Sequence, residues 1–510
     1  MRMDRIIGRA RWPRWLAALA LGAVSATGFA PLGLWPVTLV AVALWMALVR
    51  AAPGLRAALA VGWWFGLGHF IIGNDWIATA FHYQDAMPAW LGWIAVTLLA
   101  LYLALFPALA AGLGWAGGRR RGDAYPLILA AAWIFAEWLR ATLFTGFAWN
   151  PLGVIWLDAL GVARLAPFIG TYGLSGVAIL VAGGLMLLGE RRWKAGAALA
   201  AGPIAIGVAL LLAEGAPVPV RGHAVRIVQP DIGQQDKWRQ GFEDRNFARL
   251  ASLSGTPGPE PRLLLWPEAA VPEYLEESRP EDIRARARIA RLLGPRDIML
   301  TGGTAIEWGK DNFAAGARNS LFAIDARGRI LARYDKAHLV PYGEYLPMRP
   351  ILSAIGLSRL APGDLDFWPG PGPRSLGLPG FGKVGVQICY EMIFSGQVVD
   401  SAHRPDFIFN PSNDAWFGPS GPPQHLAQAR LRAIEEGLPV IRATPTGISA
   451  IIDARGNLAA SLPWRTAGAI TGRLPAALPP TPFARYGNIL PILFAGLLVA
   501  LAIAHRRIAR

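Results

Sequence analysis

Long apolar segments constrain this chain more than any other feature. Stretches of roughly 17–25 apolar residues are long enough to cross a bilayer as helices. Eight such stretches occur, at approximate positions 15–31, 33–49, 57–80, 88–115, 125–143, 165–189, 193–213 and 487–505. A polytopic α-helical membrane domain of about eight spans is therefore predicted, with 1–215 forming most of it and 485–510 its last helix.

Composition argues strongly against a cytosolic enzyme. Of 510 residues, 54% are hydrophobic and only 16% are charged. The formal net charge of +15 invites a nucleic-acid interpretation. However, many of the arginines stand in short groups beside apolar stretches, where Lys and Arg fix the orientation of membrane helices. We interpret the basicity as topology and expect no nucleic-acid partner.

The Lys and Arg groups predict an orientation. With eight spans, five groups fall on one side, while the loop at 74–88 contains neither residue type. Both termini are then cytoplasmic, and 216–484 lies on the outer side. The groups are Arg2, Arg5, Arg9, Arg11 and Arg14; Arg50 and Arg56; Arg119, Arg120 and Arg121; Arg191, Arg192 and Lys194; and Arg506, Arg507 and Arg510. Glu137 and Arg140 depart from this pattern, and their i,i+3 spacing favours a local ion pair over a substrate-binding role.

The outer region, 216–484, has the composition of one α/β domain. Short β-type runs alternate with helical stretches and Pro/Gly-rich loops. A helix is expected at 424–436, ending at Gly437, and the turn residues at 325–328 and 453–456 predict hairpins. The candidate strands are 224–229, 262–266, 297–301, 320–324, 330–334, 383–388, 406–409 and 439–442.

Cys389 is the only cysteine, so neither an intramolecular disulfide nor a Cys-based zinc site can form. The histidines show no metal-ligand spacing, and no metal or cofactor is expected. A free cysteine is commonly a small buried hydrophobic residue. On the oxidising side of a membrane, however, an idle thiol risks oxidation, and Cys389 stands directly after a buried-type strand. This context favours a nucleophile.

A thiol nucleophile needs a proton acceptor and a donor that stabilises an oxyanion. None of the outer histidines, His223, His338, His403 and His425, lies in an obvious catalytic motif. Glu268 and Lys336 each follow a candidate strand, and together with Cys389 they would supply an acid/base, a cation and a thiol. Taken singly, Glu268 and Lys336 fit surface ion pairs better than catalytic roles. Their spacing does not prove that they meet.

The motifs that carry these residues resemble the nitrilase superfamily. They are Trp-Pro-Glu at 266–268, Tyr-Asp-Lys at 334–336 with Pro-Tyr-Gly-Glu at 341–344, and Cys-Tyr-Glu at 389–391. With the flanking spans, the whole chain resembles the bacterial apolipoprotein N-acyltransferases. The resemblance implies an αββα sandwich in 216–484 with Glu268 as base, Lys336 as oxyanion stabiliser and Cys389 as nucleophile.

The resemblance also implies supporting roles. Glu344 would be a second carboxylate beside Lys336, and Glu391 would anchor the turn after the nucleophile. Trp238 and Trp416 would lie near the pocket mouth, although ordinary core or interface aromatic residues fit them equally well. Independently of the resemblance, the backbone N–H of Tyr390 is a natural oxyanion donor, because it follows the nucleophile at the turn.

The resemblance implies ping-pong acyl transfer and, together with the predicted topology, a bacterial inner membrane with a periplasmic catalytic domain. A phospholipid, with phosphatidylethanolamine as the family's usual donor, would acylate Cys389. The α-amine of a diacylglyceryl-modified apolipoprotein would then accept the chain, the last step of lipoprotein maturation. Two alternatives stay open at this stage: a membrane-tethered amidase or thioesterase that uses water as acceptor, and a non-enzymatic membrane scaffold or transporter.

Overall fold

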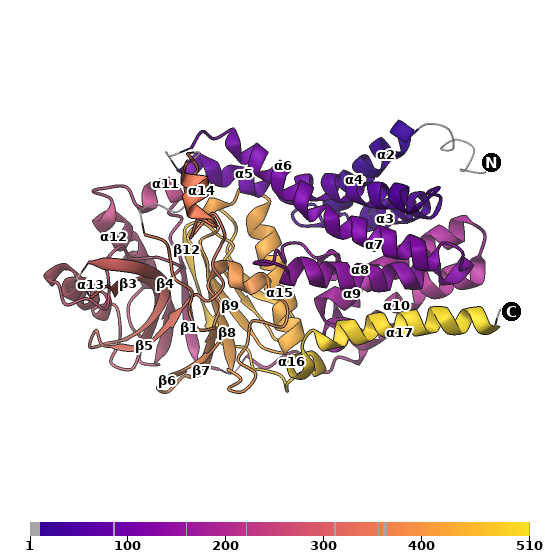
Figure 1. Cartoon of the computed structure of the whole chain (residues 1–510). Coiled ribbons are helices and arrows are strands. Elements are labelled where there is room, and N and C mark those ends of the chain that lie inside the picture. Colours follow the sequence, from indigo (N-terminus) through magenta and orange to yellow (C-terminus); the bar gives the residue numbers. More distant parts are fainter. Residues whose placement is uncertain are drawn as a thin grey trace. The chain divides into compact units, whose positions relative to one another are not determined.

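The chain divides into two compact units in the computed structural model (Figure 1). The helical unit comprises Met1–Ala78, Trp90–Ala216 and Thr481–Arg510, and the sandwich unit comprises Thr79–Ala89 and Pro217–Pro480. The structure describes residues 11–84, 87–159, 161–220, 222–310, 313–354, 356–360 and 365–508. Arg2, Arg5, Arg9 and Arg510 of the predicted basic groups lie outside these ranges.

Helices form at all eight predicted apolar segments. The α-helices of the helical unit are α2 (Arg11–Ser25), α3 (Trp35–Arg50), α4 (Leu55–Gly73), α6 (Leu91–Leu103), α7 (Leu105–Gly118), α8 (Tyr125–Thr142), α9 (Ala166–Gly189), α10 (Trp193–Ala213), α16 (Pro482–Tyr486) and α17 (Ile489–Ile508). The short α5 (Trp76–Ala80) begins in this unit, and its last two residues belong to the segment Thr79–Ala89.

Four of the described segments are long and apolar enough to cross a membrane: Leu55–Gly73, Leu91–Gly118, Val162–Gly189 and Trp193–Ala213. Trp35–Arg50 and Ile489–His505 are apolar but shorter. The structure thus supports a membrane protein with four candidate spans and does not establish the full count of eight.

Small residues allow the helices of this unit to approach closely. A Cβ at Gly22 of α2 would lie 1.9 Å from the Phe65 carbonyl oxygen of α4, and one at Gly68 would lie 2.1 Å from that of Leu19. Such contacts let backbones pack directly, as is common between membrane helices. The C-terminal α17 packs against α8 and α9, so residues from both ends of the sequence share this unit (Figure 1).

Glu137 and Arg140 form a local pair within α8. Their side chains are buried, with Arg140 Nη2 3.8 Å from Glu137 Oε1. The same Glu137 oxygen accepts the backbone N–H of Leu152 at 2.9 Å, and Arg140 Nη1 donates to the Trp149 carbonyl at 2.8 Å. These contacts tie α8 to the segment that follows it, in agreement with the ion-pair interpretation.

The sandwich unit contains two six-stranded sheets, with strand orders β12-β1-β2-β3-β4-β5 and β11-β10-β9-β8-β7-β6. Its strands are β1 (Ala224–Gln229), β2 (Arg262–Leu265), β3 (Ile298–Trp308), β4 (Ala314–Asp325), β5 (Ile330–Asp335), β6 (Ser375–Leu378), β7 (Gly382–Val386), β8 (Phe407–Pro411), β9 (Val440–Ala443), β10 (Ala450–Ile452), β11 (Leu458–Ser461) and β12 (Gly468–Arg473). Its helices are α11 (Gln234–Lys237), α12 (Glu243–Ser254), α13 (Pro280–Ala290), α14 (Arg349–Ala354) and α15 (Gly421–Glu436).

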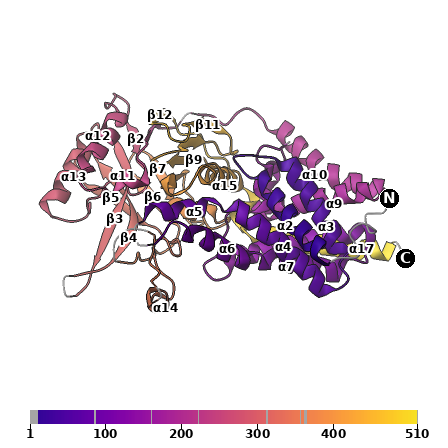
Figure 2. The ribbon, with the colours of Figure 1, turned by 90° about the horizontal axis from the view of Figure 1, so that it is seen from above.

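Successive side chains of each strand point to opposite faces of its sheet, and this alternation explains the layers of the sandwich. One face of each sheet contributes to a shared apolar core that includes Leu265, Leu300, Val386 and Phe409. The opposite face of the first sheet packs on α12 and α13, and that of the second packs on α15 (Figures 1 and 2). The predicted αββα sandwich is therefore confirmed for this unit. As expected, α15 ends at Gly437, which adopts a left-handed φ of 64°.

The parallel strands position the site. In the first sheet β1, β2 and β3 run parallel, and in the second β7, β8 and β9 do. The carboxyl ends of parallel strands share one edge of a sheet, where binding sites gather. Glu268 lies just beyond the carboxyl end of β2, and Cys389 lies just beyond the carboxyl end of β7.

Candidate active site

Glu268, Lys336 and Cys389 approach one another from both sheets. Glu268 follows β2 and the stiff Trp266–Pro267 step, Lys336 follows β5, and Cys389 follows β7. The ammonium of Lys336 lies 3.9 Å from Glu268 Oε1. Both charges interact electrostatically with the Cys389 thiol. The structure thus places the three predicted residues in one buried cluster.

Lys336 is held by two carboxylates. Its Nζ lies 2.9 Å from Glu344 Oε2, and its side chain is only 1% exposed. Burial lowers the pKa of Lys336, but the carboxylates of Glu344 and Glu268 outweigh this effect, and the net shift is upward. Lys336 therefore remains a fixed positive charge at neutral pH.

Asn319 links the two carboxylates and was not anticipated from the sequence. Its Nδ2 donates to Glu268 Oε1 at 2.6 Å and to Glu344 Oε1 at 2.8 Å. The backbone N–H of Val340 donates to Glu344 Oε2 at 2.8 Å. Glu268 Oε2 is buried and accepts no hydrogen bond from the part of the chain that the structure describes. One carboxylate oxygen of Glu268 is thus left without a fixed donor.

Cys389 rests as a neutral thiol. Burial, followed by the negative charge of Glu268, raises the pKa of Cys389 to about 12, while Lys336 opposes the shift. The residue adopts a left-handed φ of 51°, which is rare for a side chain with a Cβ. A thiol in this state needs a base during the reaction.

Glu391 holds the turn that carries Cys389. It accepts hydrogen bonds from the Tyr334 hydroxyl at 2.9 Å and from the backbone N–H groups of Ala337 and Ile388, each at 2.7 Å. Burial raises the pKa of Glu391 to about 7. The residue therefore ties the end of β5 to the end of β7, next to Lys336 and Cys389.

A second lysine lies beside the cluster. Lys237 Nζ donates to the backbone carbonyl of Glu268 at 2.9 Å, and burial lowers the pKa of Lys237 to about 8. Trp238, its neighbour, is 41% exposed. Both residues line a cleft that continues over Glu268 and Val271. The sequence gives no signal for Lys237, because a lone lysine among polar residues resembles an ordinary surface residue.

Trp416 is connected to Lys237 through the side chain of Asn413. With the Asn413 amide oxygen turned toward them, Trp416 Nε1 and Lys237 Nζ donate to it at 3.0 and 3.2 Å. The ring of Trp416 also contacts that of Tyr83 edge to face, with centroids 6.2 Å apart. Tyr83 belongs to the Thr79–Ala89 segment of the sandwich unit. A short piece from the N-terminal half of the sequence therefore helps to support the predicted tryptophan.

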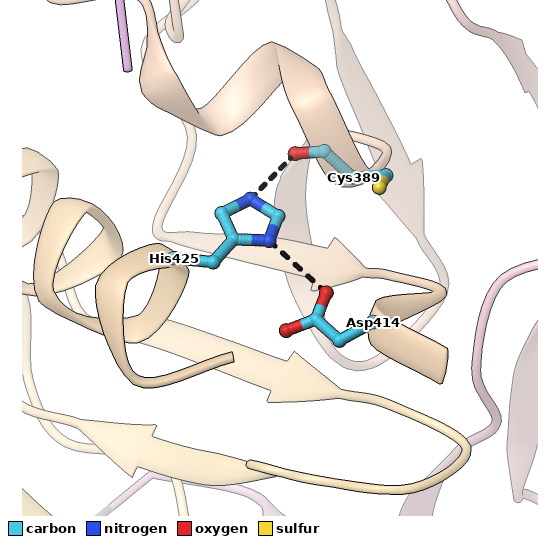
Figure 3. Close-up of side chains that lie close together, drawn as sticks. All are labelled: Cys389, Asp414 and His425. Atoms are coloured by element: carbon cyan, nitrogen blue, oxygen red, sulfur yellow. Dashed lines mark hydrogen bonds and ion pairs between the residues drawn. The ribbon is translucent and has the colours of Figure 1, made fainter. Parts of the chain in front are cut away.

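Cys389, Asp414 and His425 bring potential metal-ligating atoms within 4.8 Å of one another. The His425 ring faces the Cys389 carbonyl, however, and the sulfur points away from it (Figure 3). Asp414 is already paired with the guanidinium of Arg442. A positive side chain in this position argues against a divalent cation there.

Comparisons with known proteins match both parts of the chain. Residues 21–184 match the family model of the apolipoprotein N-acyltransferase N-terminal domain, and residues 225–479 match that of the carbon-nitrogen hydrolases. The apolipoprotein N-acyltransferase of Bradyrhizobium diazoefficiens is 37% identical, over 98% of this chain and 96% of its own length. The chain belongs to the apolipoprotein N-acyltransferase family. The Ralstonia nicotianae family member is also 37% identical, over 98% of this chain and 95% of its own.

Solved structures also align with about half of the chain. A nitrilase-superfamily amidase of a Nesterenkonia species is 17% identical, with a TM-score of 0.34, over 51% of this chain and 94% of that one. Within the acyltransferase family, Glu268, Lys336 and Cys389 all fall in the carbon-nitrogen hydrolase segment. The apolar helices fall largely in the segment typical of the family's N-terminal domain.

Proposed function

We propose that this chain transfers an acyl chain from a membrane phospholipid, through a thioester at Cys389, to the α-amino group of an apolipoprotein's N-terminal diacylglyceryl-cysteine. Family membership supports the substrate classes. The observation that carries the chemistry is the buried thiol that interacts with both Glu268 and Lys336. Glu268, Lys336 and Cys389 are the proposed catalytic residues.

Acylation begins with a proton transfer. Glu268 takes the thiol proton, with its unpartnered Oε2 as the suitable acceptor, while sulfur forms a bond to the ester carbonyl carbon. The carbonyl oxygen becomes an oxyanion that the Lys336 ammonium and the Tyr390 backbone N–H stabilise. The carbon–oxygen bond then breaks, and Glu268 returns the proton to the departing lysophospholipid. The thioester remains on Cys389.

In the transfer step Glu268 again acts as base and then as acid, now with an amine as the nucleophile. The neutral α-amine attacks the thioester carbon, and Glu268 takes a proton from the nitrogen as the second tetrahedral intermediate forms. The carbon–sulfur bond breaks, Glu268 passes this proton to the departing sulfur, and the amide leaves. Glu344 and Asn319 keep Lys336 and Glu268 in place during both halves. No metal or diffusible cofactor takes part in either step.

The thioester must survive until the acceptor binds. Cys389 is only 7% exposed, which limits the approach of water to the acyl group. A membrane-tethered amidase or thioesterase would use the same residues but give the acyl group to water. The difference between the two functions lies in the fate of the acyl-enzyme.

Location and topology are part of the proposal. We place the chain in a bacterial inner membrane with eight spans, both termini in the cytoplasm and 216–484 in the periplasm. The Lys/Arg pattern supports this orientation. Phosphatidylethanolamine is the proposed donor, and Trp238 and Trp416 are proposed to contact lipid near the site, because indole rings suit a lipid–water boundary.

The proposal is tested by intact mass. Purified protein is incubated with phosphatidylethanolamine of one acyl composition, alongside Cys389→Ala. Wild type should gain one acyl chain that hydroxylamine removes, and the variant should gain none. Adding a diacylglyceryl-cysteine peptide should discharge the chain as a peptide amide. Release as free fatty acid instead would favour the hydrolase, and no adduct on folded wild type would contradict the acyl-enzyme mechanism.

A further inference from the structure

His425 lies directly behind the nucleophile and has no role in the steps above. It projects from α15, and its Nε2 lies 3.1 Å from the carbonyl oxygen of Cys389. Its Nδ1 lies 3.0 Å from Asp414 Oδ1 and 3.0 Å from Arg442 Nη2. All three side chains are fully buried. Figure 3 shows the imidazole between Asp414 and the Cys389 carbonyl, with the sulfur directed away.

The contacts define where the ring carries hydrogen. A carbonyl oxygen can only accept, so the Nε2 that faces it must be an N–H donor. Nδ1 then either accepts from Arg442 in the neutral ring or donates to Asp414 in the charged one. Both states give the same hydrogen bond to Cys389. The support of the carbonyl is therefore independent of the charge on His425.

Holding this carbonyl has a consequence for the next residue. In a trans peptide, the C=O of one residue and the N–H of the next point in opposite directions from a single rigid plane. The Cys389 carbonyl points at His425, so the N–H of Tyr390 points away from that ring. This is the N–H assigned to the oxyanion in the proposed reaction.

We propose that His425 is a positioning residue for oxyanion stabilisation: by pinning the Cys389 carbonyl, it aims the Tyr390 N–H at the developing negative charge. This inference rests on the proposed function. Cys389 needs such a support, since its φ of 51° is disfavoured for a residue with a Cβ. A return of this φ to negative values would move the following peptide and turn the Tyr390 N–H away.

The imidazole is itself fixed from behind. The Ser412 hydroxyl donates to Asp414 Oδ1 at 2.6 Å, and Arg442 pairs with Asp414 Oδ2. Arg442 comes from β9, Asp414 follows β8, and His425 lies on α15. Residues from three elements thus fix the His425 ring, and the remaining contact of that ring is with the backbone carbonyl of Cys389. Such pre-arranged donors are effective because they need no reorganisation when charge develops.

The test compares two reactions of the same sulfur. Acylation by phosphatidylethanolamine passes through an oxyanion, whereas alkylation by iodoacetamide does not. In His425→Leu, which removes the donor, acylation should slow about 100- to 1,000-fold, the usual effect of losing an oxyanion-hole contact. Alkylation should change by less than about threefold, because the thiol and Glu268 are untouched. Both rates are followed by intact mass on the full chain.

The matched variant is His425→Gln, whose side-chain amide can still donate to the carbonyl. It should recover most of the acylation rate, and the half-saturating phospholipid concentration should stay the same in both variants. If His425→Leu does not fold, His425→Phe removes the donor while keeping a ring of similar size.

Each outcome separates the hypotheses. Equal acylation rates in wild type and a folded donor-free variant would overturn the inference, as would a parallel loss of both acylation and alkylation, which would mark a general structural role. A wild-type protein that is alkylated but never acylated would instead contradict the proposed function. Selective loss of acylation with recovery by Gln supports the positioning role.

Discussion

Two buried clusters, one for each sheet, surround the nucleophile and differ in how their charges are used. The first cluster, on the first sheet, consists of Glu268, Asn319, Lys336 and Glu344. The second cluster, on the second sheet and α15, consists of Ser412, Asp414, His425 and Arg442. Each contains a carboxylate, a cation and a neutral polar side chain that hydrogen-bonds the carboxylate.

The two clusters differ in how many oxygens of the carboxylate already accept hydrogen bonds. In the first cluster, two carboxylates share one lysine, and Glu268 Oε2 accepts no hydrogen bond from the described residues. In the second, both oxygens of Asp414 are engaged. Burial raises the pKa of Asp414, but Arg442 and His425 outweigh it and hold that pKa at about 2. Glu268 thus keeps one oxygen on which it can accept the thiol proton, whereas both oxygens of Asp414 are used to hold neighbouring side chains.

The largest effect is expected from Glu268→Gln. The amide keeps the size of the side chain and its contact with Asn319 but cannot accept the thiol proton. Acylation should slow on the order of 1,000-fold, within the range for losing a general base. Stability should change little, since Lys336 keeps Glu344 at 2.9 Å. The checks are the rate of acyl adduct formation by mass and the Tm in detergent.

The same substitution should speed a different reaction. The charge of Glu268 helps to raise the pKa of Cys389 to about 12, so the neutral amide should lower that pKa. Wild-type alkylation by iodoacetamide should rise tenfold per pH unit up to that region, because only the thiolate reacts. Glu268→Gln should react faster at pH 9. Slower alkylation would contradict the inference that the charge of Glu268 suppresses the thiolate at rest.

The first cluster could be anticipated from sequence better than the second. Glu268 and Lys336 each follow an apolar strand within a recognisable motif, and the strand–turn pattern predicts where their side chains emerge. Asn319 lies within β4, where one polar residue gives no sign of a contact across the sheet. His425 sits on an apolar-patterned helix, and only tertiary packing brings it to the Cys389 carbonyl.

The ends of strands and helices also depend on tertiary packing that the sequence pattern does not reveal. The alternation of residues predicts β3 and β4, but both extend further than expected, to Trp308 and back to Ala314, because their outer halves pair with each other rather than bury apolar faces. In the helical unit, apolarity predicts where helices form. It does not predict that α2 ends as early as Ser25 or that α3 begins only at Trp35, with Gly33, at a φ of 63°, in the turn between them.

The second cluster predicts a stability effect. Asp414→Asn leaves the fully buried Arg442 without its counter-ion, and breaking a buried pair typically costs about 3–5 kcal/mol. The Tm of the sandwich unit should fall on the order of 10 °C. Glu268→Gln, an equally small change, should leave it nearly unchanged.

The dependence of stability on acidic pH gives a second test of the role of Asp414. Its folded pKa of about 2 lies below the ordinary value of 3.8, so its contribution is present above pH 3.8 and lost as the pH falls through 2. Asp414→Asn should remove this part of the pH dependence. Equal losses of Tm in Asp414→Asn and Glu268→Gln would contradict the division between a reactive cluster and a structural one.

The smallest effect is expected at Trp238, outside both clusters. Its indole is 41% exposed beside the cleft that reaches Glu268, so it is placed to cover apolar parts of a bound lipid. Losing the burial of one large apolar side chain should raise the half-saturating phospholipid concentration about tenfold in Trp238→Ala. The maximal acylation rate should stay within about twofold, because no member of either cluster is altered.

Trp308→Ala is the matched control for this measurement. Trp308 is 51% exposed at the far end of β3, and its indole N–H donates to Glu277 rather than lining the cleft. Its loss should leave both parameters unchanged. A fall in the maximal rate of Trp238→Ala would mean that the indole acts through its neighbour Lys237, which holds the Glu268 carbonyl at 2.9 Å. Trp238 would then belong with the first cluster, and the reactive region would extend beyond the sheet edge to α11.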